Sequence, residues 1–185
     1  MEHIEIIAQF FGILGLIISV LSFQEQDNKI FFIEQGLSGL MLFLNFILIG
    51  AISAALFNLT NLVRGTFFAK KDKKLWKLIS VMLLYSVCLA FSLSKIVDDP
   101  FQIFLSVLTY LPLEVMTVLM WLGNGKHIRY GQFFVSSPSW IIHNIFNFSL
   151  GGILCEVFNM TSVIVSFIRY GKDGFETGKI LIKGK

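Results

Sequence analysis

Two asparagines stand at matching places in the sequence and could bind a polar ligand. Asn58 and Asn159 are each the eighth residue of a long apolar stretch, so at about 1.5 Å of helical rise per residue both are expected roughly 10 Å deep in a membrane. An amide donates and accepts hydrogen bonds without carrying a charge, which suits an uncharged or zwitterionic solute. The alternative is that each amide only holds helices together.

Glu114 is an ionisable residue that could carry a proton. It follows Pro112 by two residues inside the stretch 101–122, and a helix kinked by proline often lines a transport site. The alternative is a structural partner for Arg64 or for a nearby hydroxyl. Arg64 itself is expected to snorkel to water, and Glu34 to reach water from near the end of its stretch.

A second set of polar residues lies at similar depth on two later stretches. His143 with Asn144, and Glu156, are expected close together. A buried histidine beside a glutamate could relay protons, and a structural hydrogen-bonded pair is an equal alternative. Asn144 is expected at the solute site.

No pattern typical of an enzyme or a metal site stands out. His3, His127 and His143 have no metal-ligand spacing, and the sequence has no phosphate-binding glycine loop. Cys88 and Cys155 fall within apolar stretches, without a base nearby. We therefore expect no catalytic residue, no metal and no cofactor.

The chain that must position these residues is strongly apolar. Of its 185 residues, 55% are hydrophobic and 15% are charged, whereas a soluble domain keeps roughly a quarter of its residues charged. A spanning helix needs about 20 apolar residues. Seven stretches meet that length, namely 4–23, 30–48, 51–69, 75–94, 101–122, 130–148 and 152–170. The sequence therefore predicts an all-α membrane protein with seven transmembrane helices and excludes soluble enzymes.

The placement of the basic residues supports this count. Short cytoplasmic loops carry an excess of Lys and Arg, and with seven spans every basic residue except Lys95 falls on one side. We expect the N-terminus outside and the C-terminus in the cytoplasm. The net charge of +3 then reflects topology and not a nucleic-acid partner.

An internal repeat has an offset of 101 residues. Its matches are Gly50 with Gly151, Phe57-Asn58-Leu59-Thr60 with Phe158-Asn159-Met160-Thr161, and Lys71-Asp72 with Lys172-Asp173. The repeat predicts a three-helix unit over 1–69, a basic loop and linker helix over 70–100, a second three-helix unit over 101–170 and a cytoplasmic tail over 171–185. One extra helix makes the two units parallel around a pseudo-twofold axis along the membrane normal.

The second half of the chain resembles a known family. The segment Trp140-Ile141-Ile142-His143-Asn144, followed by Gly151-Gly152, Glu156 and Ile168-Arg169, resembles the YgjV family of bacterial inner-membrane proteins, which is grouped with SWEET, PQ-loop and PnuC-type transporters. The likeness covers most of the chain.

The resemblance implies a SWEET-like 3+1+3 fold. It also implies a solute site with an asparagine on the third helix of each repeat, which Asn58 and Asn159 match, and a tryptophan on the second helix, which Trp140 matches. The chain departs from the PQ-loop pattern, because Gln9 has no proline before it and Pro112 precedes Leu113. The related families imply a homotrimer.

Together these observations predict a carrier in the bacterial inner membrane for a small polar solute such as a sugar, a nucleoside or a vitamin precursor. The expected substrate-binding residues are Asn58, Asn159, Trp140 and Asn144, and the candidates for proton coupling are Glu114, Glu156 and His143. The alternative is a membrane receptor or assembly protein that transports nothing and uses the basic run Lys70 to Lys77 as its contact surface. The expected partners are the solute and membrane lipid, and no nucleic acid.

Overall fold

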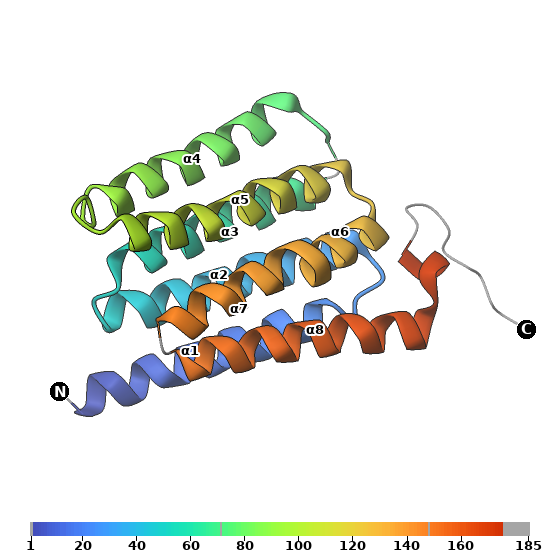
Figure 1. Ribbon diagram of the computed structural model, residues 1–185. Coiled ribbons are helices and arrows are strands. Elements are labelled where there is room, and N and C mark those ends of the chain that lie inside the picture. Colours follow the sequence, from blue (N-terminus) through green and yellow to red (C-terminus); the bar gives the residue numbers. More distant parts are fainter. Residues whose placement is uncertain (1, 71, 148, 176–185) are drawn as a thin grey trace, which may run out of the picture.

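The computed structural model describes residues 2–70, 72–147 and 149–175, and every regular element in that part is helical (Figure 1). The elements are α1 (Glu2–Ser22), α2 (Asn28–Leu48), α3 (Ile52–Ala69), α4 (Leu75–Leu93), α5 (Pro100–Leu122), α6 (Gly125–Gly131), a π-helical turn η1 (Gln132–Ser136), α7 (Ser137–Phe146), α8 (Leu150–Tyr170) and a 3-10 turn η2 (Lys172–Phe175). Within these residues α1, α2, α4, α5 and α8 are long and apolar enough to cross a membrane. The prediction of an all-α, multi-pass membrane protein is confirmed.

The sixth predicted stretch is not one regular helix. It consists of α6, η1 and α7 and begins at Gly125 instead of residue 130, because the Asn124 side chain accepts hydrogen bonds from the first backbone N–H groups and starts the helix there. In η1 the Ser137 N–H donates to the Gln132 carbonyl, five residues back. Pro138 follows directly, and it has no N–H to offer a regular ladder.

The helices form two layers. In Figure 1, α5, α6 with α7, and α8 lie side by side in front of α3, α2 and α1, and α4 lies along one edge. The middle helix of each layer contacts both of its neighbours, and between the layers α1 contacts α8 and α3 contacts α5. The tail residues Lys179, Lys183 and Lys185, and Lys71 of the repeat, lie outside the described residues.

Glycines bring α2 and α3 into close contact. A Cβ atom added to Gly65 would lie 2.5 Å from the Phe32 carbonyl oxygen and 2.7 Å from the Gly36 Cα atom. A Cβ atom on Gly39 would lie 2.9 Å from both the Asn58 carbonyl oxygen and the Asn61 Cβ atom. Small residues allow this approach, and dispersion contacts between close helices stabilise a bundle in lipid. The glycines thereby fix the position of the polar face of α3.

The apolar core occupies one half of the bundle. Its buried members are Phe23, Phe31, Phe32, Phe68, Ala69, Val81, Tyr85, Leu113, Met116, Met120, Ile128 and Val163. They lie toward the end of the bundle that carries Lys70, Lys73 and Lys126, and Tyr85 is at the middle of α4. We call this end of the molecule the basic end. The bundle is therefore closed by packed side chains on the basic side.

The contact between α2 and α3 can be tested at one glycine. We expect Gly65→Ala to destabilise the protein by about 2 kcal/mol, because the added methyl group meets backbone atoms that cannot move aside. Thermal unfolding of the detergent-purified protein measures the effect. Gly151→Ala is the matched control, since no atom lies within 4 Å of a Cβ there. Equal melting temperatures for the two variants would contradict the close contact.

Candidate functional site

A polar cluster lies between α3, α4 and α5, deep within the helices. We call it the α3–α5 cluster, and its members are Asn61, Arg64, Tyr85, Tyr110, Glu114 and Thr117. The Tyr85 hydroxyl, which is fully buried, donates to Asn61 Oδ1 at 2.5 Å. Asn61 Nδ2 in turn donates to Asn58 Oδ1 at 3.4 Å, and Asn58 Nδ2 donates to the Ala54 carbonyl at 2.9 Å. The predicted site residue Asn58 is thus the last member of a hydrogen-bonded chain that begins on α4.

One charged side chain expected to reach water is buried instead. Arg64 is only 6% exposed, because α4 and α5 cover it. Its guanidinium lies 5.6 Å from the centre of the Tyr85 ring and donates to Thr117 Oγ1 at 3.4 Å. The prediction that Arg64 snorkels is therefore wrong. Glu34 is half-buried, and its Oε2 atom has no hydrogen-bond partner among the described residues.

Glu114 lies in the α3–α5 cluster without a direct partner. Both of its carboxyl oxygens are buried, and in the described part of the chain neither is within hydrogen-bonding geometry of a donor. The groups that act on it electrostatically are the Tyr110 hydroxyl and the Arg64 guanidinium. Tyr110 itself shares a hydrogen bond of 2.8 Å with Ser86. A carboxyl group and a guanidinium therefore lie near each other with unused acceptors and donors.

Glu156 packs against the π-helical turn. Its Oε2 accepts a hydrogen bond from Ser137 Oγ at 2.6 Å and one from Gln132 Nε2 at 3.4 Å. Gln132 Nε2 also donates to Ser137 Oγ at 2.9 Å, because the wider π turn puts residues five apart on nearly the same face. No hydrogen bond joins Glu156 to His143 among the described residues, so the expected pair is not formed directly.

His143, Trp140 and Asn144 lie on α7, near α8. The rings of Trp140 and His143 meet edge to face with centroids 5.5 Å apart, and His143 Nδ1 is buried without a hydrogen-bond partner in the described chain. Asn144 is 9% exposed, and a Cβ atom on Gly152 would lie 2.5 Å from its amide. Asn144 is thus held at the contact between α7 and α8.

The two repeat-related asparagines lie in separate polar contacts. Asn159 is buried, and its Oδ1 accepts a hydrogen bond of 3.2 Å from Ser19 on α1. Further along the same seam, Gln24 Nε2 donates to Ser162 Oγ at 2.8 Å. Within the described residues no hydrogen bond joins Asn159 to Asn58, and α3 and α8 have different neighbours. The two asparagines do not contact each other directly in this conformation.

Arg129 is the buried residue that the sequence pattern missed most clearly. It is fully buried, although it was expected in a loop at the membrane surface. Its guanidinium donates to the carbonyls of Phe23 at 2.9 and 3.1 Å, of Glu25 at 2.5 Å and of Gly125 at 3.1 Å. It also lies 3.7 Å from the centre of the Phe175 ring. No local sequence signal distinguishes it from a surface arginine, because the carbonyls of Phe23 and Glu25 lie 106 and 104 residues away.

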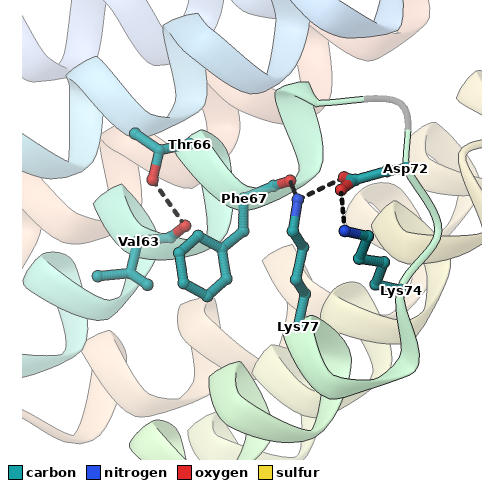
Figure 2. A network of polar contacts seen from close by, with 6 residues as sticks. All are labelled: Val63, Thr66, Phe67, Asp72, Lys74 and Lys77. Carbon is teal, nitrogen blue, oxygen red and sulfur yellow. Dashed lines mark hydrogen bonds and ion pairs between the residues drawn. The ribbon is translucent and has the colours of Figure 1, made fainter.

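Lys77 has a similar role at the end of α3. It is 5% exposed, and its Nζ donates to the Phe67 carbonyl at 3.2 Å, one of the carbonyls left without a helical partner at a helix C-terminus. Figure 2 shows the same Nζ in contact with the Asp72 carboxylate, which also faces Lys74 Nζ at 3.7 Å. The hydrogen bond from Lys77 lowers the pKa of Asp72 below its ordinary value of 3.8.

Replacing Arg129 should show how much the bundle depends on it. We expect Arg129→Met to destabilise the protein by about 3 kcal/mol, because the carbonyls of Phe23 and Glu25 lose this donor. Thermal unfolding in detergent measures this loss. The control is Lys126→Met on the same short helix, which should change the melting temperature little. An unchanged melting temperature for Arg129→Met would contradict the role of Arg129.

Asp72 should make stability depend on pH. Since its pKa is lowered in the folded protein, its contribution is present above the ordinary pKa of 3.8 and is lost as the pH falls through the folded value. Asp72→Asn should therefore melt below the wild type at pH 7, and the difference should shrink as the pH falls below 3.8. Asp98→Asn, at the opposite end, is the control and should show no closing difference. A difference that stays constant from pH 7 to pH 3 would count against the ion pair.

The comparison with known proteins bears on the chain as a whole. No curated protein and no solved structure matches it. The model of one family, Imp-YgjV, described as bacterial inner membrane protein, matches residues 6–173. The matched range includes the α3–α5 cluster, the π-helical turn with Glu156 and the buried Arg129. With nearly its full length matched, the chain belongs to the YgjV family of bacterial inner membrane proteins.

Proposed function

We propose that the protein is a carrier for a small polar, uncharged or zwitterionic solute. The observation that carries this proposal is the α3–α5 cluster, in which Arg64 and Glu114 are buried without a close ion pair. Charges at membrane depth are costly, and they usually face a solute path or a wet cavity. A helix bundle that needed only stability would more easily place apolar side chains there.

The hydrogen-bonding groups of the cluster suit hydroxyl and amide groups on a solute. Asn58 and Asn61 offer amides, and Tyr85 offers a hydroxyl, within one connected set. Rearranging such a set requires little energy, because a solute hydroxyl can replace one protein partner with another. We assign Asn58 to solute binding on α3, and Asn159, Trp140 and Asn144 to the corresponding face of the second half.

The distribution of packing supports alternating access. The apolar core fills the basic half of the bundle, and Phe32, Phe68 and Met120 are buried there. The proposed barrier is this packed half, which separates the polar residues from the basic end. Carriers of this size open and close such barriers by moving one helical unit against the other around a fixed site.

The helix arrangement supports two equivalent three-helix units. In this scheme α1 is equivalent to α5, α2 to α6 with α7, and α3 to α8. The contact between α1 and α8 is then equivalent to the contact between α5 and α3. Both contacts are present, as a pseudo-twofold axis requires. In this 3+1+3 scheme α4 is the linker, and the basic end is cytoplasmic by the distribution of Lys and Arg.

Proton coupling is proposed for Glu114, with Glu156 as a second candidate. Among the described residues, neither carboxyl oxygen of Glu114 lies within hydrogen-bonding geometry of a donor, and the Tyr110 hydroxyl is the neighbouring hydrogen-bonding group. Glu156 already accepts from Ser137 and Gln132, which favours a structural role at the π turn. His143 lies on α7 with an Nδ1 atom that has no hydrogen-bond partner in the described part of the chain, and we assign it to proton exchange.

Solute counterflow in proteoliposomes tests the proposal. A panel of labelled sugars, nucleosides and vitamin precursors is presented to the wild type, and at least one solute class should exchange. The double variant Asn58→Ala, Asn159→Ala should lower that exchange about tenfold or more, through the loss of hydrogen bonds to the solute. Thr161→Val, at an exposed position of α8, is the control and should leave exchange unchanged.

The outcomes test the carrier function and the assigned binding residues separately. Exchange that survives the double variant would contradict the assignment of the asparagines and leave the carrier intact. No exchange of any solute class would contradict the carrier and favour a receptor or assembly protein. Glu114→Gln, compared under a pH gradient, should abolish solute accumulation and retain counterflow if Glu114 carries the coupled proton.

A further inference from the structure

A cavity of about 200 Å³ opens at the basic end between the start of α2 and the ends of α3 and α5. One part of its lining is apolar and consists of Phe32, Phe68, Met120 and Trp121. At about 30 Å³ per water, the cavity has room for roughly six waters. It can therefore hold a compact polar group together with a short apolar attachment.

The other part of the lining is basic. Lys29, Lys70 and Lys73 line the cavity, with Asn28 and Asp72. Among the described residues, the ion pairs of this region join Asp72 to Lys74 and Lys77, so the only carboxylate of the lining is already neutralised. The three lysines thus give the cavity a net positive charge.

A further contact fixes one cation at the cavity. Lys73 Nζ donates to the Leu122 carbonyl at 2.7 Å, which holds this cation beside the end of α5. An ammonium group held in place loses less freedom when it binds an anion, so this contact prepares the cavity for a negatively charged group.

We propose that this cavity binds a phosphate ester whose apolar part rests on Phe32, Phe68 and Met120. Lysines bind phosphate as point charges, and basic pockets between membrane helices on the cytoplasmic side bind anionic lipid head groups. A phosphate also accepts several hydrogen bonds at once, so it pairs with more than one of the three lysines together. This proposal does not depend on the transport proposal, since no residue of the α3–α5 cluster lines the cavity.

The phosphate could come from a lipid head group or from a free phosphate compound, and the choice of probe distinguishes the two. Delipidated full-length protein in detergent is titrated with dihexanoyl phosphatidylglycerol, glycerol 3-phosphate and inorganic phosphate, with dihexanoyl phosphatidylcholine as the comparison lipid. Native mass spectrometry and thermal shift report binding. Binding of the anionic lipid alone supports a head-group site, and binding of glycerol 3-phosphate or phosphate as well supports a free anion.

Two double variants test the position of the site. Lys29→Gln with Lys70→Gln should weaken binding about 25-fold, at about fivefold for each lysine. The control, Lys126→Gln with Arg169→Gln, removes the same charge from the basic end outside the cavity lining and should change binding by less than about twofold.

Two results would overturn the proposal. One is that no phosphate probe binds more tightly than phosphatidylcholine. The other is that the control double variant weakens binding as much as the Lys29 and Lys70 double variant does, which would show attraction to the whole basic end and not to this cavity.

Discussion

Helix ends close to the membrane leave backbone carbonyls without partners, and in this protein buried cations supply the missing donors. Arg129 does this for Phe23 and Glu25 beyond α1, and it also donates to the Gly125 carbonyl four residues back in its own helix α6. The Arg129 guanidinium also contacts the Phe175 ring, so the segment after α8 is held at the same side chain. Because the unpaired carbonyls are costly where water is scarce, one side chain holds three distant segments together, and the packed basic half of the bundle is organised around it.

The buried charged side chains differ in how completely they are hydrogen-bonded. Lys77 donates to the Phe67 carbonyl and to the Asp72 carboxylate, and each nitrogen of the Arg129 guanidinium donates to a carbonyl. Within the described residues, Arg64 has an Nε atom without an acceptor, and Glu114 has two oxygens without a donor. The difference separates charges that hold the fold from charges that remain available for binding. The π-helical turn is intermediate, since it brings Gln132 and Ser137 onto Glu156 and so satisfies a carboxylate that the apolar surroundings would otherwise penalise.

The helices of the bundle make two kinds of contact, one through closely approaching backbones and one through packed apolar side chains. Gly36 and Gly65 allow α2 and α3 to meet nearly backbone to backbone, so this pair behaves as a rigid unit. Between the layers, large side chains such as Phe32 and Met120 pack together, and hydrogen bonds such as that from Ser19 to Asn159 join the same layers. The basic cavity lies at the rim of this interlayer packing, where an anion would contact both layers.

Composition and the distribution of charge determined the class of protein, because 55% hydrophobic residues in long stretches can be buried only in lipid or in a helix bundle. The sequence also located the helices to within a few residues and identified Asn58 and Glu114 as polar residues inside them. It did not predict that Arg64, Lys77 and Arg129 would be buried, since a basic residue near a helix end has the same local pattern whether it meets water or a carbonyl. Only the tertiary structure decided which residues contact each other. The Phe23 and Glu25 carbonyls that accept from Arg129 lie 106 and 104 positions away in the sequence. The partners of Glu156 depend on a π turn, which the hydrophobic periodicity does not show. Long-range contacts and local irregularities of the helices determine which residues contact each other, and neither produces a periodic pattern in the sequence.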